Sequence, residues 1–219
     1  MESFFSPQGL ELSKENFISL YSEIYFYKNR NLALEQKMEK LLYCDSLSAD
    51  DIFEILCWKT GSANADTQSR TIKTQYITIQ TTPIEVLLAG KKPQVHEPEV
   101  AKALFEKISQ FDGIGSVYAI TLLHFLSCGE WPIYDRFAHL ALLAIAQSLG
   151  IPSIITDAEL ASLFHANAAR VFDDYMQYQR LLHTFFGDAY KEDRNIDRAL
   201  WAYGHLFNES KENKIRIKQ

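Results

Sequence analysis

The sequence predicts a protein made mainly of helices, and three observations favour that class. Apolar residues recur at helical spacing through most of the chain. Serine, aspartate or proline stands at the start of several of these segments, where such residues commonly begin a helix. Hydrophobic residues make up 47% of the 219 positions and charged residues 23%, as in a globular protein with an ordinary core. A chain of this length forms one large domain or two small, closely packed lobes.

Three helices are expected in the first part of the chain. Ser13 is placed to cap the first helix, whose apolar stripe starts at Phe17. The second helix is expected over residues 32–43, with charged side chains on its solvated face: Glu35, Lys37, Glu39 and Lys40. The run from Ser48 to Asp51 has the composition of a helix start and leads into the third helix.

Residues 70–82 fit two interpretations. Their isoleucine, threonine and tyrosine content favours a strand, whereas Ile72, Tyr76 and Ile79 also share one helical face. Because the surroundings are helical, we expect a helix here. A short helix is expected over residues 83–88, before Gly90.

Residues 91–98 include two prolines and form the best linker in the sequence. They predict a boundary between an N-terminal helical lobe, residues 1–92, and a second lobe, residues 93–219. The C-terminal helices of the second lobe are expected to pack back on the first. These helices are expected over residues 136–149, after a capping box at Thr156 and Glu159, over residues 170–186, and after Asn195 as a cap.

The most informative stretch runs from Phe111 to Ala119, with the sequence Phe-Asp-Gly-Ile-Gly-Ser-Val-Tyr-Ala. A helix is expected to end at Gln110, because Gly113 and Gly115 then interrupt the helical periodicity. Residues 116–127 are apolar almost all round, which is typical of a buried helix. A helix that starts at such a turn presents its first backbone N–H groups to a ligand, and this arrangement favours a phosphate.

Residues 111–136 resemble the helix-hairpin-helix motif of the base-excision DNA glycosylase superfamily. The run from Pro132 to Asp135 is most similar to the adenine-mismatch glycosylases, and its distance from the hairpin is the one in that branch. The resemblance implies an all-α, two-lobed, glycosylase-like fold with a cleft that faces double-stranded DNA. It also implies that the hairpin, Gly113, Ile114, Gly115 and Ser116, holds a DNA phosphate.

By the same resemblance, Asp135 is the catalytic residue that acts at a flipped-out base. A carboxylate there would stabilise positive charge on the sugar as the glycosidic bond breaks, or would orient a water molecule. The alternative is structural, because aspartate is a common helix cap and a helix is expected to start at Arg136. Arg136 itself would neutralise a phosphate or form a surface ion pair.

Several positions depart from the family pattern. Val117 stands where bifunctional members carry a nucleophilic lysine, so any activity would be monofunctional hydrolysis without lyase activity. Asp112 replaces the usual proline, and Ser116 replaces a frequent basic residue. No recognisable motif in the N-terminal half supplies the glutamate that the adenine-mismatch branch uses as its acid.

Three aromatic residues near the motif, Tyr118, Trp131 and Tyr134, would be able to stack on an extruded base. Core packing is the alternative, and we favour it for Tyr118 and Trp131. His124 and His139 lie in apolar segments and are expected to be core histidines.

The number and spacing of the cysteines predict which cofactors the protein holds, and the N-terminal sequence predicts its compartment. Cys44, Cys57 and Cys128 are too scattered for a disulfide framework and are expected to be core thiols. Three cysteines cannot supply the four thiolates of the iron–sulfur cluster that many adenine-mismatch relatives carry, and no metal or other cofactor is expected. With no membrane-length apolar run and no signal-like N-terminus, we expect a cytoplasmic protein.

The charge balance keeps a second function open. The net charge is −6, whereas DNA affinity comes largely from basic side chains. The same fold would then be a binding module for nucleic acid or protein without chemistry. A third possibility is an unrelated helical protein whose glycine turn only mimics the motif.

Overall fold

The computed structural model describes residues 3–5, 11–28, 32–61, 65–74, 77–150 and 168–217. In this part of the chain lie ten helices and seven short strands, so the prediction of a mainly helical protein is confirmed. None of these helices is long and apolar enough to cross a membrane. The chain folds into two compact units. The first comprises Met1–Arg30, Tyr134–Leu163 and Met176–Gln219, and the second comprises Asn31–Ile133 and Phe164–Tyr175. The expected boundary after residue 92 therefore lies inside the second unit.

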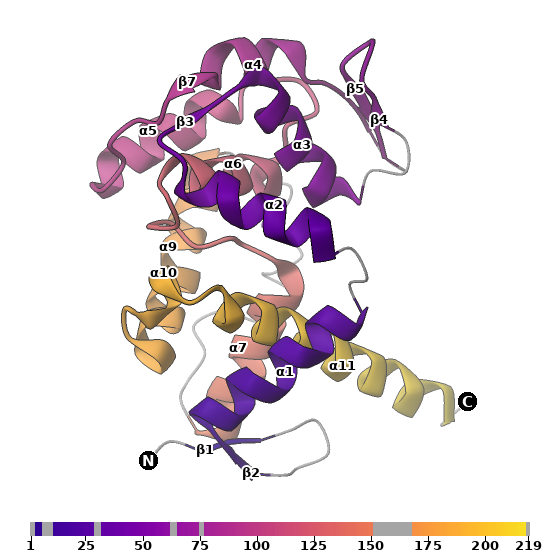
Figure 1. Ribbon diagram of the computed structural model, residues 1–219. Coiled ribbons are helices and arrows are strands. Elements are labelled where there is room, and N and C mark those ends of the chain that lie inside the picture. The colour runs from indigo at the N-terminus through magenta and orange to yellow at the C-terminus, as the bar shows by residue number, and fades with distance from the viewer. Residues whose placement is uncertain are drawn as a thin grey trace. The chain divides into compact units, whose positions relative to one another are not determined.

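The first unit is built from both ends of the chain. Its elements are β1 (Ser3–Phe5), β2 (Glu11–Ser13), α1 (Lys14–Lys28), α7 (Arg136–Ser148), the last part of α9 (Ala168–Phe186), α10 (Ala189–Glu192) and α11 (Arg194–Ile217). Helix α11 packs along α1 and against α7 (Figure 1), so the C-terminal helix contacts the N-terminal one. The apolar centre of this unit includes Phe4, Phe17 and Tyr203, whose rings lie edge to face or tilted.

A close contact between α11 and α7 depends on Gly204 in α11. A β-carbon at this position would fall on the backbone carbonyl of Phe137 in α7. Only glycine lets the two backbones approach so closely. This contact brings the middle of α11 to the first turn of α7.

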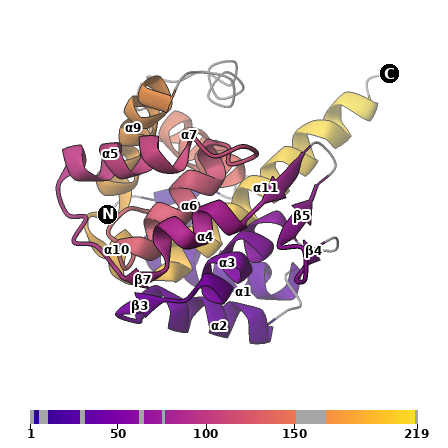
Figure 2. The ribbon, with the colours of Figure 1, turned by 90° about the horizontal axis from the view of Figure 1, so that it is seen from above.

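The second unit is built from the middle of the chain. Its elements are α2 (Leu32–Tyr43), β3 (Ser46–Leu47), α3 (Ala49–Thr60), β4 (Ala65–Asp66), β5 (Thr71–Lys73), β6 (Thr78–Gln80), α4 (Thr82–Leu88), β7 (Gly90–Lys91), α5 (Pro98–Ile108), α6 (Ser116–Leu126) and the first part of α9. Helix α6 contacts α2, α3 and α5 (Figure 2). Its residues from Ala119 to Leu126 are all buried, as the apolar sequence predicts.

The expected helix over residues 70–82 is wrong. The described part forms β5 and β6, which pair antiparallel with Ile72 opposite Ile79. Both isoleucines are fully buried, whereas the residues on either side of each are less buried. This period of two fits a half-buried strand pair, in which the β-branched residues pack against their cross-strand neighbours.

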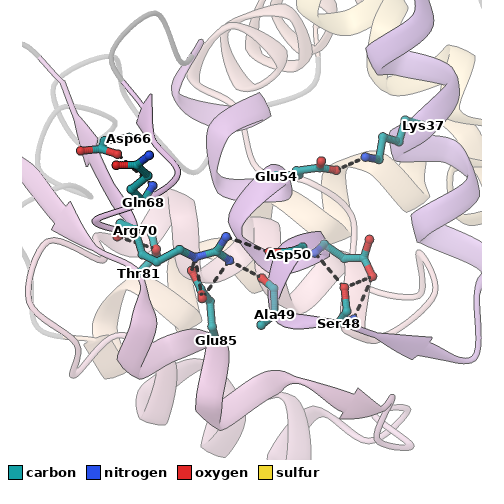
Figure 3. Close-up of polar contacts among 11 residues, drawn as sticks. Lys37, Ser48, Ala49, Asp50, Glu54, Asp66, Gln68, Arg70, Thr81 and Glu85 are labelled. Carbon is teal, nitrogen blue, oxygen red and sulfur yellow. Dashed lines mark hydrogen bonds and ion pairs between the residues drawn. The ribbon is translucent and has the colours of Figure 1, made fainter.

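A charged network ties this sheet to α3 and α4. Arg70 donates from Nε to both carboxylate oxygens of Glu85, from Nη1 to Asp50 at 2.8 Å and from Nη2 to the carbonyl of Ala49 (Figure 3). The carbonyl of Arg70 accepts from the backbone and the hydroxyl of Thr81. These bonds hold Arg70 at a φ of 53°, a left-handed conformation that residues other than glycine rarely adopt.

Most predicted helix starts are found. Ser48 and Asp51 form a full capping box for α3, and the Ser13 hydroxyl accepts from the backbone of Asn16. The last helix starts at Arg194, so Asn195 lies inside it and is not its cap. The predicted capping box at Thr156 and Glu159 lies outside the described residues.

Candidate functional site

The turn between α5 and α6 is formed by the glycine hairpin. Helix α5 ends at Ile108, and the amide of Ile114 donates to the carbonyl of Phe111 at 3.0 Å. Gly113 has a φ of +79°, the left-handed conformation in which glycine carries no steric penalty. A β-carbon on Gly113 would lie 3.0 Å from the carbonyl oxygen of Thr78 and 3.3 Å from Cα of Ile79. Gly113 is therefore required both by the turn and by its close contact with β6.

Gly115 differs from Gly113 in both respects. Its φ of −74° is open to any residue, and an added β-carbon would meet nothing within 4 Å. Gly115 is exposed and is the N-cap of α6, but as glycine it offers no side chain to cap the helix.

The N-terminus of α6 presents backbone donors that no side chain caps. The amides of Tyr118 and Ala119 donate to the carbonyl of Gly115, so those of Ser116 and Val117 precede the first intrahelical bonds. The first turn of α6 contains no acidic residue. The side chain of Ile114 is buried, which leaves only its backbone for contact with a ligand. This helix end has the local properties of an anion site.

Asp135 lies at the start of α7 in the first unit. It is the N-cap of that helix, and its Oδ1 accepts from the backbone N–H of Phe137 at 2.8 Å. The capping role expected from the sequence is thus present, whether or not the residue also acts in catalysis. The side chain is half-buried.

His205 is a site neighbour that sequence reasoning missed. Its ring stacks on Phe137 with centroids 3.5 Å apart and contacts Trp201 at 4.0 Å. Burial lowers the pKa of His205 below its usual value, and the nearby charge of Asp135 opposes this shift. No local motif points to His205, because only the packing of α11 on α7 at Gly204 brings it there.

Two of the three aromatic candidates, Trp131 and Tyr134, are held in the interior of their own units. Trp131 is 2% exposed and donates from its indole to the carbonyl of Val95 at 2.6 Å. Tyr134 is 4% exposed, and its hydroxyl lies 3.1 Å from Nδ1 of His139. Tyr118 is half-buried, and burial raises the pKa of its phenol. Stacking on a base would require Trp131 and Tyr134 to leave these contacts, so the core alternative describes them better.

The other predicted side chains divide between surface and core. Arg136 is exposed, with its guanidinium 5.5 Å from the ring centre of Phe137, where it remains accessible to a phosphate. His124 and His139 are buried, as expected. Burial lowers the pKa of His139 to about 4.

A buried carboxylate corrects the expectation for α2. Glu35, expected on the solvated face, is 1% exposed, and its Oε1 accepts from the indole N–H of Trp58 at 2.7 Å. The helical pattern of charges could not reveal this, because the partner that permits burial comes from α3. Glu35 and Glu85, which is 4% exposed and paired with Arg70, are two buried glutamates in the N-terminal half that no motif had indicated.

The cysteines also differ from expectation. Cys44 and Cys57 are half-buried and Cys128 is exposed, so none of the three is a core thiol. Cys128 has a φ of 53° in the turn after α6, which places it at the surface in spite of its apolar neighbours. Within the described ranges, no group of three or more histidine, cysteine or acidic side chains is arranged to hold a metal ion.

The site residues thus fall into two local groups. Gly113, Ile114, Gly115 and Ser116 form the hairpin group in the second unit, and Asp135, Arg136 and His205 form the α7 group in the first.

Comparisons of the chain with protein-family models, with curated proteins and with solved structures find no match.

Proposed function

We propose that the protein is a DNA-glycosylase-like protein that holds a phosphate of double-stranded DNA at the N-terminus of α6. At Asp135 it would hydrolyse the N-glycosidic bond of a damaged or mispaired base. The observation that carries the proposal is the open start of α6, a glycine hairpin with neither a capping side chain nor an acidic first turn. A phosphate at this end would accept from the first amides and would be stabilised by the helix dipole.

In this reaction the bond between C1′ and the base nitrogen breaks, and the electron pair leaves with the base. The Asp135 carboxylate would stabilise the positive charge that develops on the sugar, while a water oxygen forms the new bond to C1′ and the proton that the water loses replaces the one given to the departing base. Val117 cannot form a Schiff base, so the product would be an abasic site in an intact strand.

Glu35 is our choice for the acid that protonates the departing base. The adenine-mismatch glycosylases, which the motif resembles, use a glutamate from the N-terminal half in this role. Glu35 has a buried carboxyl oriented by the Trp58 indole.

A binding module without chemistry is the second proposal, and the charge favours it. The chain has a net charge of −6, and exposed Asp112 adds a carboxylate beside the hairpin. The cap bond to Phe137 gives Asp135 a structural role that would be retained without catalysis.

The test of catalysis is a panel of duplexes that carry alkylated, oxidised, deaminated or mispaired bases, treated with hot alkali after incubation. Cleavage that Asp135→Asn abolishes would support the glycosylase, because asparagine keeps the helix cap and removes only the charge. Glu35→Gln keeps the acceptor for Trp58 and should also abolish cleavage. No base release from any duplex, together with salt-dependent binding, would instead support the module.

The phosphate site is tested by Ser116→Pro. Proline is well accepted at the first position of a helix, and the extended backbone of Gly115 suits a residue before proline. The substitution therefore removes one outward N–H without breaking α6. Ser116→Ala keeps that N–H and is the control. Equal DNA binding by the two variants would contradict a phosphate site at this helix end.

A further inference from the structure

A buried lysine lies at the end of α2. Lys92 is 8% exposed, and its Nζ donates to the carbonyls of Leu41 and Leu42 at 2.8 Å and 2.7 Å. Carbonyls in the last turn of a helix have no intrahelical partner, so Lys92 caps this helix end. The backbone amide of Lys92 donates to the carbonyl of Asp45 at 2.9 Å, which fixes the residue beside the cap.

The ammonium group of Lys92 also faces a cysteine. It has three N–H donors, and the two carbonyls of α2 accept from two of them. The third is left for Sγ of Cys128, which lies 3.9 Å from Nζ. Among the residues that the structure describes, no carboxylate forms an ion pair with Lys92. Because a buried charge without a counter-charge is costly, negative charge on Cys128 would be stabilised here.

The thiol of Cys128 is at the surface. The residue is exposed in the turn after α6, where its φ of 53° is a left-handed conformation that residues other than glycine rarely adopt. Cys128 and Lys92 belong to the same compact unit. An accessible thiol beside a lysine is the environment in which protein cysteines react, because the thiolate is the nucleophile and the ammonium stabilises it.

Cys44 has different surroundings, although it lies at the same helix end. It is half-buried, and its Sγ donates to the carbonyls of Leu41 and Ser46 at 3.2 Å and 2.9 Å. These bonds use the thiol proton, whereas the sulfur of Cys128 faces a positive charge. Cys44 is therefore an internal control for the reactivity of Cys128.

We propose that Cys128 is a site of oxidation by hydrogen peroxide and that Lys92 assists the reaction. The thiolate attacks one peroxide oxygen, so that an S–O bond forms and the O–O bond breaks. The electron pair of the broken bond goes to the leaving hydroxide, which takes a proton from Lys92 and departs as water; Lys92 regains its proton from solvent. The sulfur is oxidised by two electrons to a sulfenic acid, and the peroxide is reduced. A thiol reductant would restore the cysteine.

The experiment treats the full chain with hydrogen peroxide at pH 7 and traps sulfenic acid with dimedone. Peptide mass spectrometry then follows the labelling of each cysteine, relative to free cysteine in the same solution. We expect Cys128 to be labelled about tenfold faster in the folded protein than in concentrated urea, where Lys92 no longer lies beside it. Cys44 and Cys57 should instead be labelled faster in urea, because unfolding exposes them.

Two variants test the part played by the lysine. Lys92→Gln keeps a donor for the carbonyls of α2 but removes the charge, and should lower the labelling of Cys128 in the folded protein to the rate seen in urea. Lys91→Gln makes the same charge change at an exposed neighbour and should not alter the rate.

The outcomes decide the proposal without reference to DNA. Labelling of Cys128 that is no faster in the folded wild type than in urea would overturn it. A folded Lys92→Gln variant that is labelled as fast as the wild type would overturn the role of Lys92. If this variant does not fold, the comparison of folded and unfolded wild type decides alone. Because the assay contains no nucleic acid, failure of the proposed glycosylase activity would leave the result unchanged.

Discussion

The helices α6 and α7 start from similar backbones but present different chemistry. Gly115 and Asp135 are both extended N-caps, with ψ values of 169° and 139°. The start of α7 already has a carboxylate on its first amides, whereas that of α6 has no side chain there. The difference indicates that an external anion would bind α6 in preference to α7, because at α7 it would compete with Asp135.

The largest effect is expected from Gly204→Ala, which would disturb the α7 start alone. The new methyl group would collide with the Phe137 carbonyl, so α7 and α11 would have to separate. We expect a loss of about 3 kcal/mol in the free energy of unfolding, measured with urea. An alanine in place of a helical glycine otherwise stabilises by up to about 1 kcal/mol. An unchanged or raised midpoint would therefore contradict the close contact.

Lowering the pH should cause the next largest loss of stability, through His139 in α7. His139 is fully buried in α7, and burial lowers its pKa to about 4, whereas an unfolded chain binds the proton at about 6.5. The unfolded state therefore takes up more protons between these values, and stability falls as the pH drops below 6.5. By pH 4.5 the loss should be about 2.5 kcal/mol.

Urea unfolding at pH 7 and pH 4.5 would measure this loss. His139→Gln removes the titrating group and should abolish most of the difference in stability between the two pH values. The lowered pKa of His205 acts in the same direction and accounts for part of what remains. If His139→Gln lost as much stability between pH 7 and pH 4.5 as the wild type does, His139 would not be the source of the loss.

The two hairpin glycines should respond differently to alanine. Gly113→Ala forces an L-residue into φ +79° and presses its methyl group on β6, at an expected cost of about 2 kcal/mol. Gly115→Ala meets no neighbour and should cost under about 1 kcal/mol. Thermal unfolding of both variants measures the contrast. Equal losses of stability in the two variants would contradict the close contact of Gly113 with β6.

The smallest effect comes from changing the caps. Gly115→Asp would give α6 the start that α7 has, and should raise stability by about 0.5 kcal/mol while weakening DNA binding. Asp135→Ala would remove the α7 cap and should cost about 1 kcal/mol, while Asp135→Asn should cost almost nothing. Unfolding and duplex binding, measured on the same variants, test whether the start of α6 binds an external anion while Asp135 caps α7. Stronger DNA binding by Gly115→Asp would contradict it.

Local sequence was enough to predict many helices and caps of this protein. The bounds of α2, the capping box of Ser48, the glycine break before α6 and the cap at Asp135 all follow from interactions within a few residues. The functional role of the motif stays a prediction, since it came from a resemblance and not from these local rules.

Tertiary structure decided what depends on partners distant in sequence. Trp58 allows Glu35 to be buried, Gly204 brings His205 to the start of α7, and strand pairing makes residues 71–80 a sheet. A charge pattern on one helix does not reveal a hydrogen-bond donor on another, and a β-branched segment takes its structure from the partner it pairs with. For this reason the burial of Glu35 and the place of His205 are visible only in the folded chain.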